Sequence, residues 1–100
     1  MPEAAARLAL PPGSTIGILG SGQLGRMLAM AAARLGLATH VYCPHSGPAF
    51  DVATHTTKAA FDDLSALSAF AASVQVVTFE FENVAVETAR HLAQLVLDYL

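Results

Sequence analysis

The chain has 100 residues, of which 54% are hydrophobic and 13% charged, and its net charge is −3. This length allows one small compact domain. Five basic residues are too few for the clustered Lys and Arg surface that nucleic acids require. The apolar run 27–33 lies between two arginines and is far shorter than the roughly 20 residues that span a bilayer.

A single cysteine, Cys43, excludes an internal disulfide and favours a protein of the reducing cytoplasm. Glu3 precedes any basic residue, so the first residues do not have the pattern of a secretory signal. We predict that residues 1–14 are a flexible lead-in and that residues 15–100 form one domain.

Residues 15–28 predict a buried strand, a glycine turn and the start of a helix. The turn has the pattern G-x-G-x-x-G. Gly20 allows a sharp turn, Gly22 removes a Cβ where a ligand meets the backbone, and Gly25 lets the helix pack closely on the sheet. The first N–H groups of the helix carry its positive dipole end, which favours phosphate or carboxylate as the ligand.

A first helix is predicted over residues 23–35, with Gly36 as its left-handed stop. A second strand follows over residues 38–42 and ends at Pro44, which cannot donate to a sheet. The side chains of the helix that we expect in the core are Leu24, Met27, Leu28, Met30, Ala31 and Leu35.

Residues 45–58 read as a loop. Asp62 or Asp63 is predicted to cap a second helix that runs to about residue 72, and residues 74–79 form a third strand. A third helix is expected over residues 86–100. The apolar side of the second helix is predicted to carry Leu64, Leu67, Phe70 and Ala71.

This order predicts an α/β fold, a Rossmann-like parallel sheet with helices on both faces. Right-handed crossovers place the ligand site at the carboxyl ends of the strands. Three strands are fewer than such a sheet usually has, so we expect the chain to be a fragment of a longer protein.

A nicotinamide cofactor is one candidate ligand of the glycine turn. Such a site expects a carboxylate at the end of the second strand to hold the ribose hydroxyls. That place is filled by residues 42–45, which read Tyr-Cys-Pro-His, and the next carboxylate is Asp51. The sequence therefore keeps an anion site and disfavours NAD(P), and a dehydrogenase domain stays the alternative function.

The third strand ends in residues 76–84, which contain Glu80 and Glu82. Two residues apart in a strand, these carboxylates point to opposite sides, so only one can face the ligand crevice. The alternative is that both only solvate the end of the strand.

Residues 16–28 and 77–84 together resemble the amino-terminal pre-ATP-grasp domain of N5-carboxyaminoimidazole ribonucleotide synthases. The resemblance covers about residues 15–94. It implies an ATP-dependent carbon–nitrogen ligase of purine biosynthesis. That enzyme uses ATP and bicarbonate, through carboxyphosphate, to convert 5-aminoimidazole ribonucleotide to its N5-carboxylated form. The family also implies a homodimer in full-length form, with ATP and magnesium sites beyond residue 100, so this chain alone should bind no cofactor and be inactive.

By the same resemblance, the ribonucleotide is held by Gly22, Gln23, Leu24 and Glu80. Gln23 can donate and accept hydrogen bonds, and Glu80 can accept them from hydroxyl or amine groups. No catalytic residue and no metal ligand is assigned. Many family members have an aspartate near the position of Cys43, and this chain lacks it.

Three side chains, His40, Cys43 and His45, have the spacing H-x-x-C-x-H, but strand alternation separates them and no fourth zinc ligand is evident. Arg26 either meets a phosphate or is solvated. A third, non-enzymatic function is an interaction module, in which the last helix docks a partner chain through Leu92, Val96 and Leu100.

Overall fold

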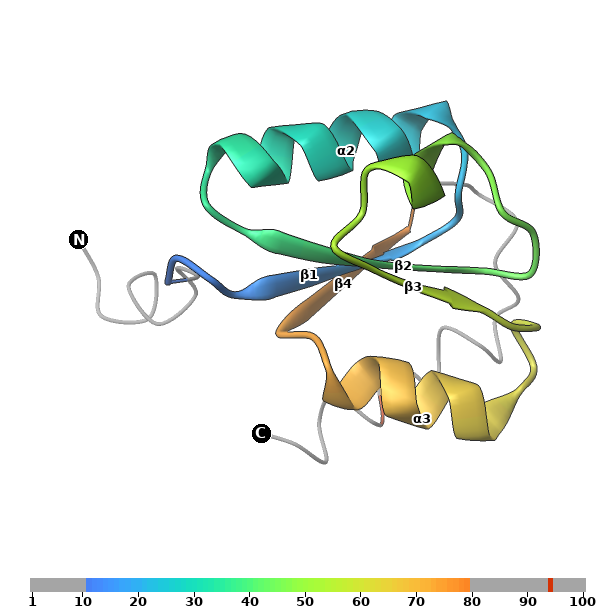
Figure 1. Ribbon diagram of the computed structural model, residues 1–100. Coiled ribbons are helices and arrows are strands. Elements are labelled where there is room, and N and C mark those ends of the chain that lie inside the picture. The colour runs from blue at the N-terminus through green and yellow to red at the C-terminus, as the bar shows by residue number, and fades with distance from the viewer. Residues whose placement is uncertain (1–10, 80–93, 95–100) are drawn as a thin grey trace.

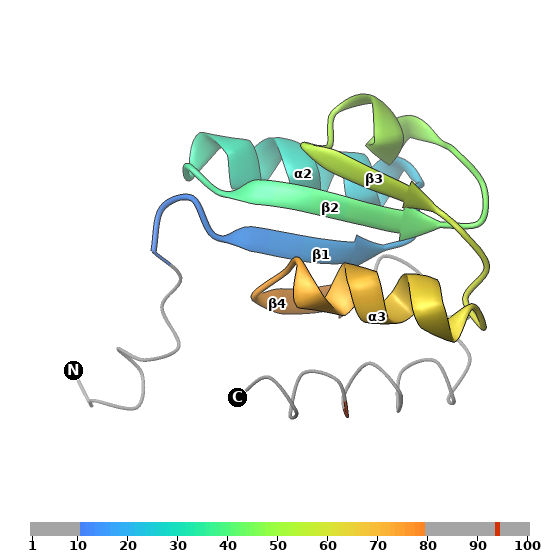
Figure 2. The same cartoon turned by 60° about the horizontal axis from the view of Figure 1, so that its bottom comes forward.

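The computed structural model describes residues 11–79 and Gln94. Four parallel strands form one sheet in the order β3-β2-β1-β4. Helix α2 (Gln23–Arg34) lies on one face of this sheet and helix α3 (Leu64–Ala72) on the other, as Figures 1 and 2 show. The predicted α/β fold is therefore confirmed. The strands are β1 (Thr15–Leu19), β2 (Ala38–Cys43), β3 (His55–Lys58) and β4 (Val76–Phe79).

Each face of the sheet has its own hydrophobic core, because successive residues of a strand point to opposite sides. Ile18 and Val41 pack with Ala29 of α2. Their neighbours Leu19 and Tyr42 pack on the other face in a second cluster, whose α3 members are Leu67, Phe70 and Ala71. The two central strands are thus buried on both sides, as parallel strands usually are.

The prediction of a loop over residues 45–58 was wrong. A short 3-10 helix, η1 (Pro48–Asp51), and strand β3 lie in this range. Strand β3 forms one edge of the sheet and aligns His55 with His40 of β2. Its sequence HTTK has no apolar side chain to reveal a strand, and backbone pairing to β2 is what holds it.

Helix α2 begins at Gln23 as predicted and ends at Arg34, one residue before the predicted end, and Gly36 follows with a φ of +77°. The predicted core face of α2 was wrong. The buried residues are Gly25, Ala29 and Ala32, whose small side chains let the helix lie close to the sheet. The large side chains are displaced outward, and their exposed fractions reach 59% at Met27 and 72% at Leu35. The other exposed large residues of this helix are Leu24, Leu28 and Met30.

Helix α3 packs on the sheet through Leu67, Phe70 and Ala71, as predicted. Leu64 in its first turn is 57% exposed and does not belong to the core. Of the two candidate caps, the structure selects Asp63, whose carboxylate accepts a hydrogen bond of 3.0 Å from the backbone N–H of Ala66.

We expect Asp63→Ala to lower the free energy of unfolding by about 1 kcal/mol, because the N–H of Ala66 loses its acceptor. Asp62→Ala is the matched control, since it removes a neighbouring carboxylate that does not cap the helix; its effect should stay within about 0.5 kcal/mol. Urea denaturation of both variants measures the difference. Equal losses in the two variants would contradict the assignment of the cap.

Several predicted features fall outside the described residues. These are Glu80, Glu82 and most of the helix predicted over residues 86–100, of which Gln94 alone is described, as helical and exposed. Of the described helices, none combines the length and the hydrophobicity that a membrane span requires.

Candidate ribonucleotide site

The glycine turn joins the carboxyl end of β1 to the start of α2. Gly20 has a φ of +115°, which side-chain-bearing residues rarely adopt, and its N–H donates to the carbonyl of Tyr42 at 3.0 Å. Gly22 caps α2 without a side chain, and the first helical bond of the turn runs from Arg26 N–H to the Gly22 carbonyl at 3.1 Å. The earlier N–H groups of the helix have no acceptor within the helix. These N–H groups face the space beyond the carboxyl edge of the sheet. The positive end of the helix dipole favours an anion there.

The sequence-predicted residues are placed together as far as the structure describes them. Gly22, Gln23 and Leu24 form the amino end of α2, and both Gln23 and Leu24 are exposed. Strand β4 lies beside β1 and aligns Phe79 with Leu19. Phe79 directly precedes Glu80 in the chain, so the end of the described β4 is level with the start of the glycine turn.

The chain that follows β2 also meets the glycine turn, which the sequence did not reveal. The Ser21 hydroxyl donates to the carbonyl of His45 at 2.7 Å, and the N–H of Ala49 donates to the carbonyl of Ser21 at 2.9 Å. Gly47 lies between these two contacts and packs directly on Ser21. The Gly-Pro pair at positions 47 and 48 indicates a turn, but no local sequence pattern indicates that this turn contacts Ser21.

Arg26 lies one turn into α2 and is partly buried. Its Nε is buried and, among the described residues, has no hydrogen-bond partner. A buried guanidinium nitrogen without an acceptor is costly. Arg26 lies near the positive end of α2, where an anion is favoured, so contact with a phosphate stays a prediction.

His40 is held in a network on the α3 side of the sheet. Its Nδ1 lies 2.7 Å from the Ser73 hydroxyl, and its Nε2 lies 2.7 Å from the Thr57 hydroxyl. Because Ser73 donates its single hydroxyl proton to the carbonyl of Phe70, it must accept from His40, which places the proton of the neutral ring on Nδ1. The Thr57 hydroxyl then donates to Nε2. Both ring nitrogens are thus engaged.

The H-x-x-C-x-H spacing gains no support from this geometry. His40 and Cys43 are three residues apart in β2 and face opposite sides of the sheet. Among the described residues, no group of three His, Cys, Asp or Glu side chains is placed to hold a metal ion.

Burial of the His40 ring, and secondarily the charge of His55 nearby, lower the pKa of His40 below 6.5. The unfolded chain therefore takes up a proton near pH 6.5, whereas the folded chain does so only at lower pH. We expect the free energy of unfolding to fall as the pH drops below about 6.5 and to stop falling once folded His40 is protonated. Denaturation between pH 8 and pH 5 measures this slope. It should become smaller in His40→Gln and persist in His45→Gln, which changes an exposed histidine; equal slopes in all three proteins would refute the role of His40.

Residues 11–79 present no cluster of cationic side chains that fits the phosphates of ATP. The sequence has one lysine, Lys58, which lies at the end of the exposed edge strand β3. Phosphates of ATP require a cluster of cationic and backbone donors, and magnesium requires carboxylates.

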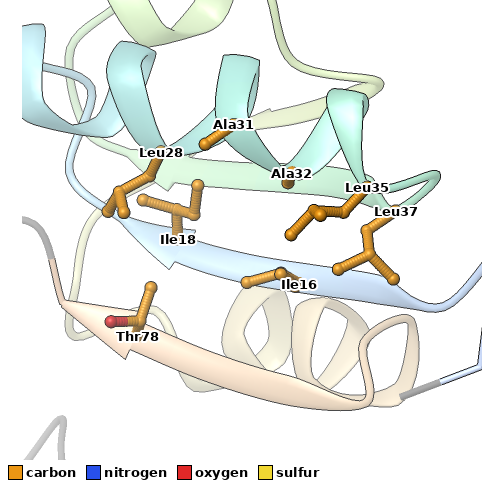
Figure 3. A pocket seen from close by; sticks show the side chains of 8 residues that line it. All are labelled: Ile16, Ile18, Leu28, Ala31, Ala32, Leu35, Leu37 and Thr78. Carbon is orange, nitrogen blue, oxygen red and sulfur yellow. The ribbon is translucent and has the colours of Figure 1, made fainter. Parts of the chain in front are cut away.

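An apolar pocket lies on the α2 side of the sheet, away from the glycine turn. In Figure 3, Leu28, Ala31 and Leu35 extend from α2 above Ile16 and Ile18 of β1, and Thr78 of β4 is beside them. Its lining offers no charged group, so it is unsuited to a phosphorylated ligand. Helix α2, which follows the glycine turn, thus exposes apolar side chains in its later turns.

A protein-family model matches residues 13–98. The matching model describes the ribonucleotide synthetase pre-ATP-grasp domain. Among curated proteins, the chain is 58% identical over 90 residues to the bifunctional purine synthesis protein purC/E of Dictyostelium discoideum, covering 89% of this chain and 9% of that protein. It is 54% identical over 92 residues to the N5-carboxyaminoimidazole ribonucleotide synthase of Brucella melitensis, covering 91% of this chain and 25% of that protein.

The chain is also similar to solved structures of N5-carboxyaminoimidazole ribonucleotide synthases. A crystal structure of an N5-carboxyaminoimidazole ribonucleotide synthetase in complex with ADP has a TM-score of 0.81 and 41% identity, over 86% of this chain and 23% of that one. The Aspergillus clavatus synthase in complex with ADP and 5-aminoimidazole ribonucleotide has a TM-score of 0.71 and 32% identity, over 85% of this chain and 23% of that one. The chain thus spans a quarter or less of the length of these relatives.

Proposed function

Because the chain belongs to the ribonucleotide synthetase pre-ATP-grasp family, we propose that it is the ribonucleotide-binding amino-terminal part of an N5-carboxyaminoimidazole ribonucleotide synthase. The reaction is the ATP- and bicarbonate-dependent carboxylation of 5-aminoimidazole ribonucleotide in purine biosynthesis. The chain supplies a substrate half-site, and the ATP-grasp part supplies the chemistry.

The observation that carries the proposal is the amino end of α2, which has no side-chain cap and lies at the sheet edge where β4 also ends. An anionic ribonucleotide has a natural partner in these N–H groups. Gln23 donates to and accepts from the ribose or the aminoimidazole, Gly22 lets the ligand approach the backbone, and Leu24 contributes its N–H. Glu80 accepts a hydrogen bond from a hydroxyl or amine of the substrate.

The nicotinamide alternative is less well supported. No carboxylate stands at the end of β2, and Asp51 lies in η1. Moreover, the backbone that follows β2 lies on Ser21 of the glycine turn. In a dinucleotide site, the ribose of the cofactor is bound between these two segments. The third alternative is an interaction module that docks through Leu92, Val96 and Leu100. These residues lie outside the described part of the chain.

Several properties of the complete enzyme are part of the proposal. Bicarbonate is its second substrate. Magnesium accompanies ATP, and the sites for ATP and magnesium lie outside residues 1–100. We propose that the domain starts near residue 15, that the enzyme is cytoplasmic and that it is a homodimer. The exposed apolar side chains of α2, such as Met27 and Leu28, support association. Light scattering of the complete enzyme tests its oligomeric state.

The direct test is an NMR titration of this chain with 5-aminoimidazole ribonucleotide, in which NAD is the control ligand. We expect the amide signals of Gln23 and Leu24 to shift with the ribonucleotide and not with NAD. Shifts with NAD alone would favour the dehydrogenase. The second readout is a grafted synthase, in which this chain replaces the matched quarter of the Brucella melitensis enzyme. If the grafted synthase folds but does not carboxylate the ribonucleotide, the proposed function is wrong.

A further inference from the structure

We propose that the contact between Ser21 and the segment 45–49, here called the latch, positions the first N–H groups of α2 and thereby sets the affinity for the ribonucleotide. The proposal rests on the proposed function, because it concerns the same site. Ser21 and Gly47 are positioning residues and do not themselves touch the ligand. The latch consists of Ser21, the carbonyl of His45, Gly47 and the N–H of Ala49.

The latch holds Ser21 from two sides. Its hydroxyl donates to the carbonyl of His45 at 2.7 Å, and its own carbonyl accepts from the N–H of Ala49 at 2.9 Å. Ser21 is the middle residue of the turn, directly before the helix cap Gly22. Any displacement of Ser21 therefore moves the start of α2.

The segment that grips Ser21 is itself fixed in the core. Ala49 is 0% exposed and packs with Ile18, Ala29 and Val41. Pro48 begins η1 and restricts the backbone next to Gly47. The latch thus connects a rigid core cluster to the glycine turn, which on its own would have the freedom of a glycine-rich segment.

Gly47 is a glycine because of space and not because of its backbone conformation. Its φ is −156°, which any residue adopts. A Cβ at this position would lie 2.5 Å from the carbonyl oxygen of Ser21 and 2.8 Å from its hydroxyl oxygen. The carbonyl oxygen belongs to the backbone, so a side-chain rotation cannot remove the clash. To reach the 3.4 Å of an ordinary contact, the segment 45–49 and the glycine turn must move apart by about 1 Å.

Such a shift matters for binding because hydrogen bonds weaken steeply with distance and angle. Misplacement of binding groups by about 1 Å can reduce catalysis about 100-fold. The first amides of α2 belong to a single rigid helix and move together. The latch therefore affects the ribonucleotide specifically, and ATP, which is bound elsewhere, should be indifferent to it.

The test uses steady-state kinetics of the grafted synthase with Gly47→Ala and Ser21→Ala. Gly47→Ala introduces the clash, and Ser21→Ala removes one latch bond with no added bulk. We expect the KM for the ribonucleotide to rise about tenfold in Gly47→Ala and about threefold in Ser21→Ala. The KM for ATP should stay within twofold. Ser46→Ala, at an exposed position in the same segment, is the matched control and should behave as the parent.

Two outcomes would overturn the latch. A KM for the ribonucleotide within twofold of the parent in both variants would overturn the latch, and so would a parallel rise in the KM for ATP, which indicates general damage. Gln23→Ala separates this failure from that of the proposed function. If Gln23→Ala raises the KM and the latch variants do not, the latch alone is wrong; if none of them changes it, the substrate site is misplaced as well.

Discussion

Gln23→Ala in the grafted synthase is expected to raise the KM for 5-aminoimidazole ribonucleotide about tenfold and to leave the KM for ATP unchanged. Gln23 is exposed in the first turn of α2, where its amide is free to meet a ligand. Loss of a hydrogen bond to a neutral group costs about 0.5–1.5 kcal/mol, and loss of a bond to a charged group costs up to about 3 kcal/mol. Each 1.4 kcal/mol is about tenfold in affinity.

Glu80→Ala should have a larger effect, about 10- to 100-fold, because a carboxylate makes stronger hydrogen bonds than an amide. Initial rates at varied ribonucleotide and fixed saturating ATP, and then the reverse, separate the two KM values. Met30→Ala is the control for a change on α2, since Met30 is 41% exposed and lies about two turns from the site. Unchanged ribonucleotide kinetics in both the Gln23 and Glu80 variants would reject the site assignment.

Gly17→Ala should destabilise the domain by about 1–3 kcal/mol, the usual cost of overpacking a core. Gly17 lies in the middle of β1 and is buried. A Cβ there would lie 2.6 Å from Cζ of Phe70 and 3.2 Å from both γ carbons of Val74. Phe70 cannot withdraw easily, because its ring packs edge-on against His40, with 4.9 Å between ring centroids, and at a tilt against Tyr42, with 5.2 Å between centroids.

A double-mutant cycle identifies the cause of that loss. Phe70→Leu removes the ring that a Cβ at position 17 would meet, so Gly17→Ala should cost less in the Phe70→Leu background than in the parent. Urea denaturation of the four proteins gives the coupling energy. Additive losses would show that the ring does not cause the effect, and no loss in Gly17→Ala would show that the strand can shift to accept a Cβ.

Local sequence patterns were sufficient for most elements. The β-branched run before Gly20, the stop at Gly36 and the acidic cap before α3 each depend on residues close together in the chain. The structure bears out these three predictions. The glycine turn could be recognised for the same reason, since its backbone requirements are local.

Other features depend on distant partners and were therefore missed. Strand β3 has no apolar pattern and exists because β2 offers it a backbone ladder. The orientation of α2 was also missed, because its apolar residues extend around more than one side. The helix lies close to the sheet, so only the side with Gly25, Ala29 and Ala32 can face it. The space between helix and sheet is too narrow for the larger side chains.

Short, contiguous motifs encode the α/β class, the glycine turn and the family to which the chain belongs, so all three could be read from the sequence. Tertiary structure decided how the turn is held. The hydroxyl of Ser21 meets the backbone of His45, and His40 meets Ser73, only after the strands are aligned. Such contacts join residues more than 20 positions apart, and a hydroxyl or an imidazole has many possible partners until packing brings one within hydrogen-bond distance.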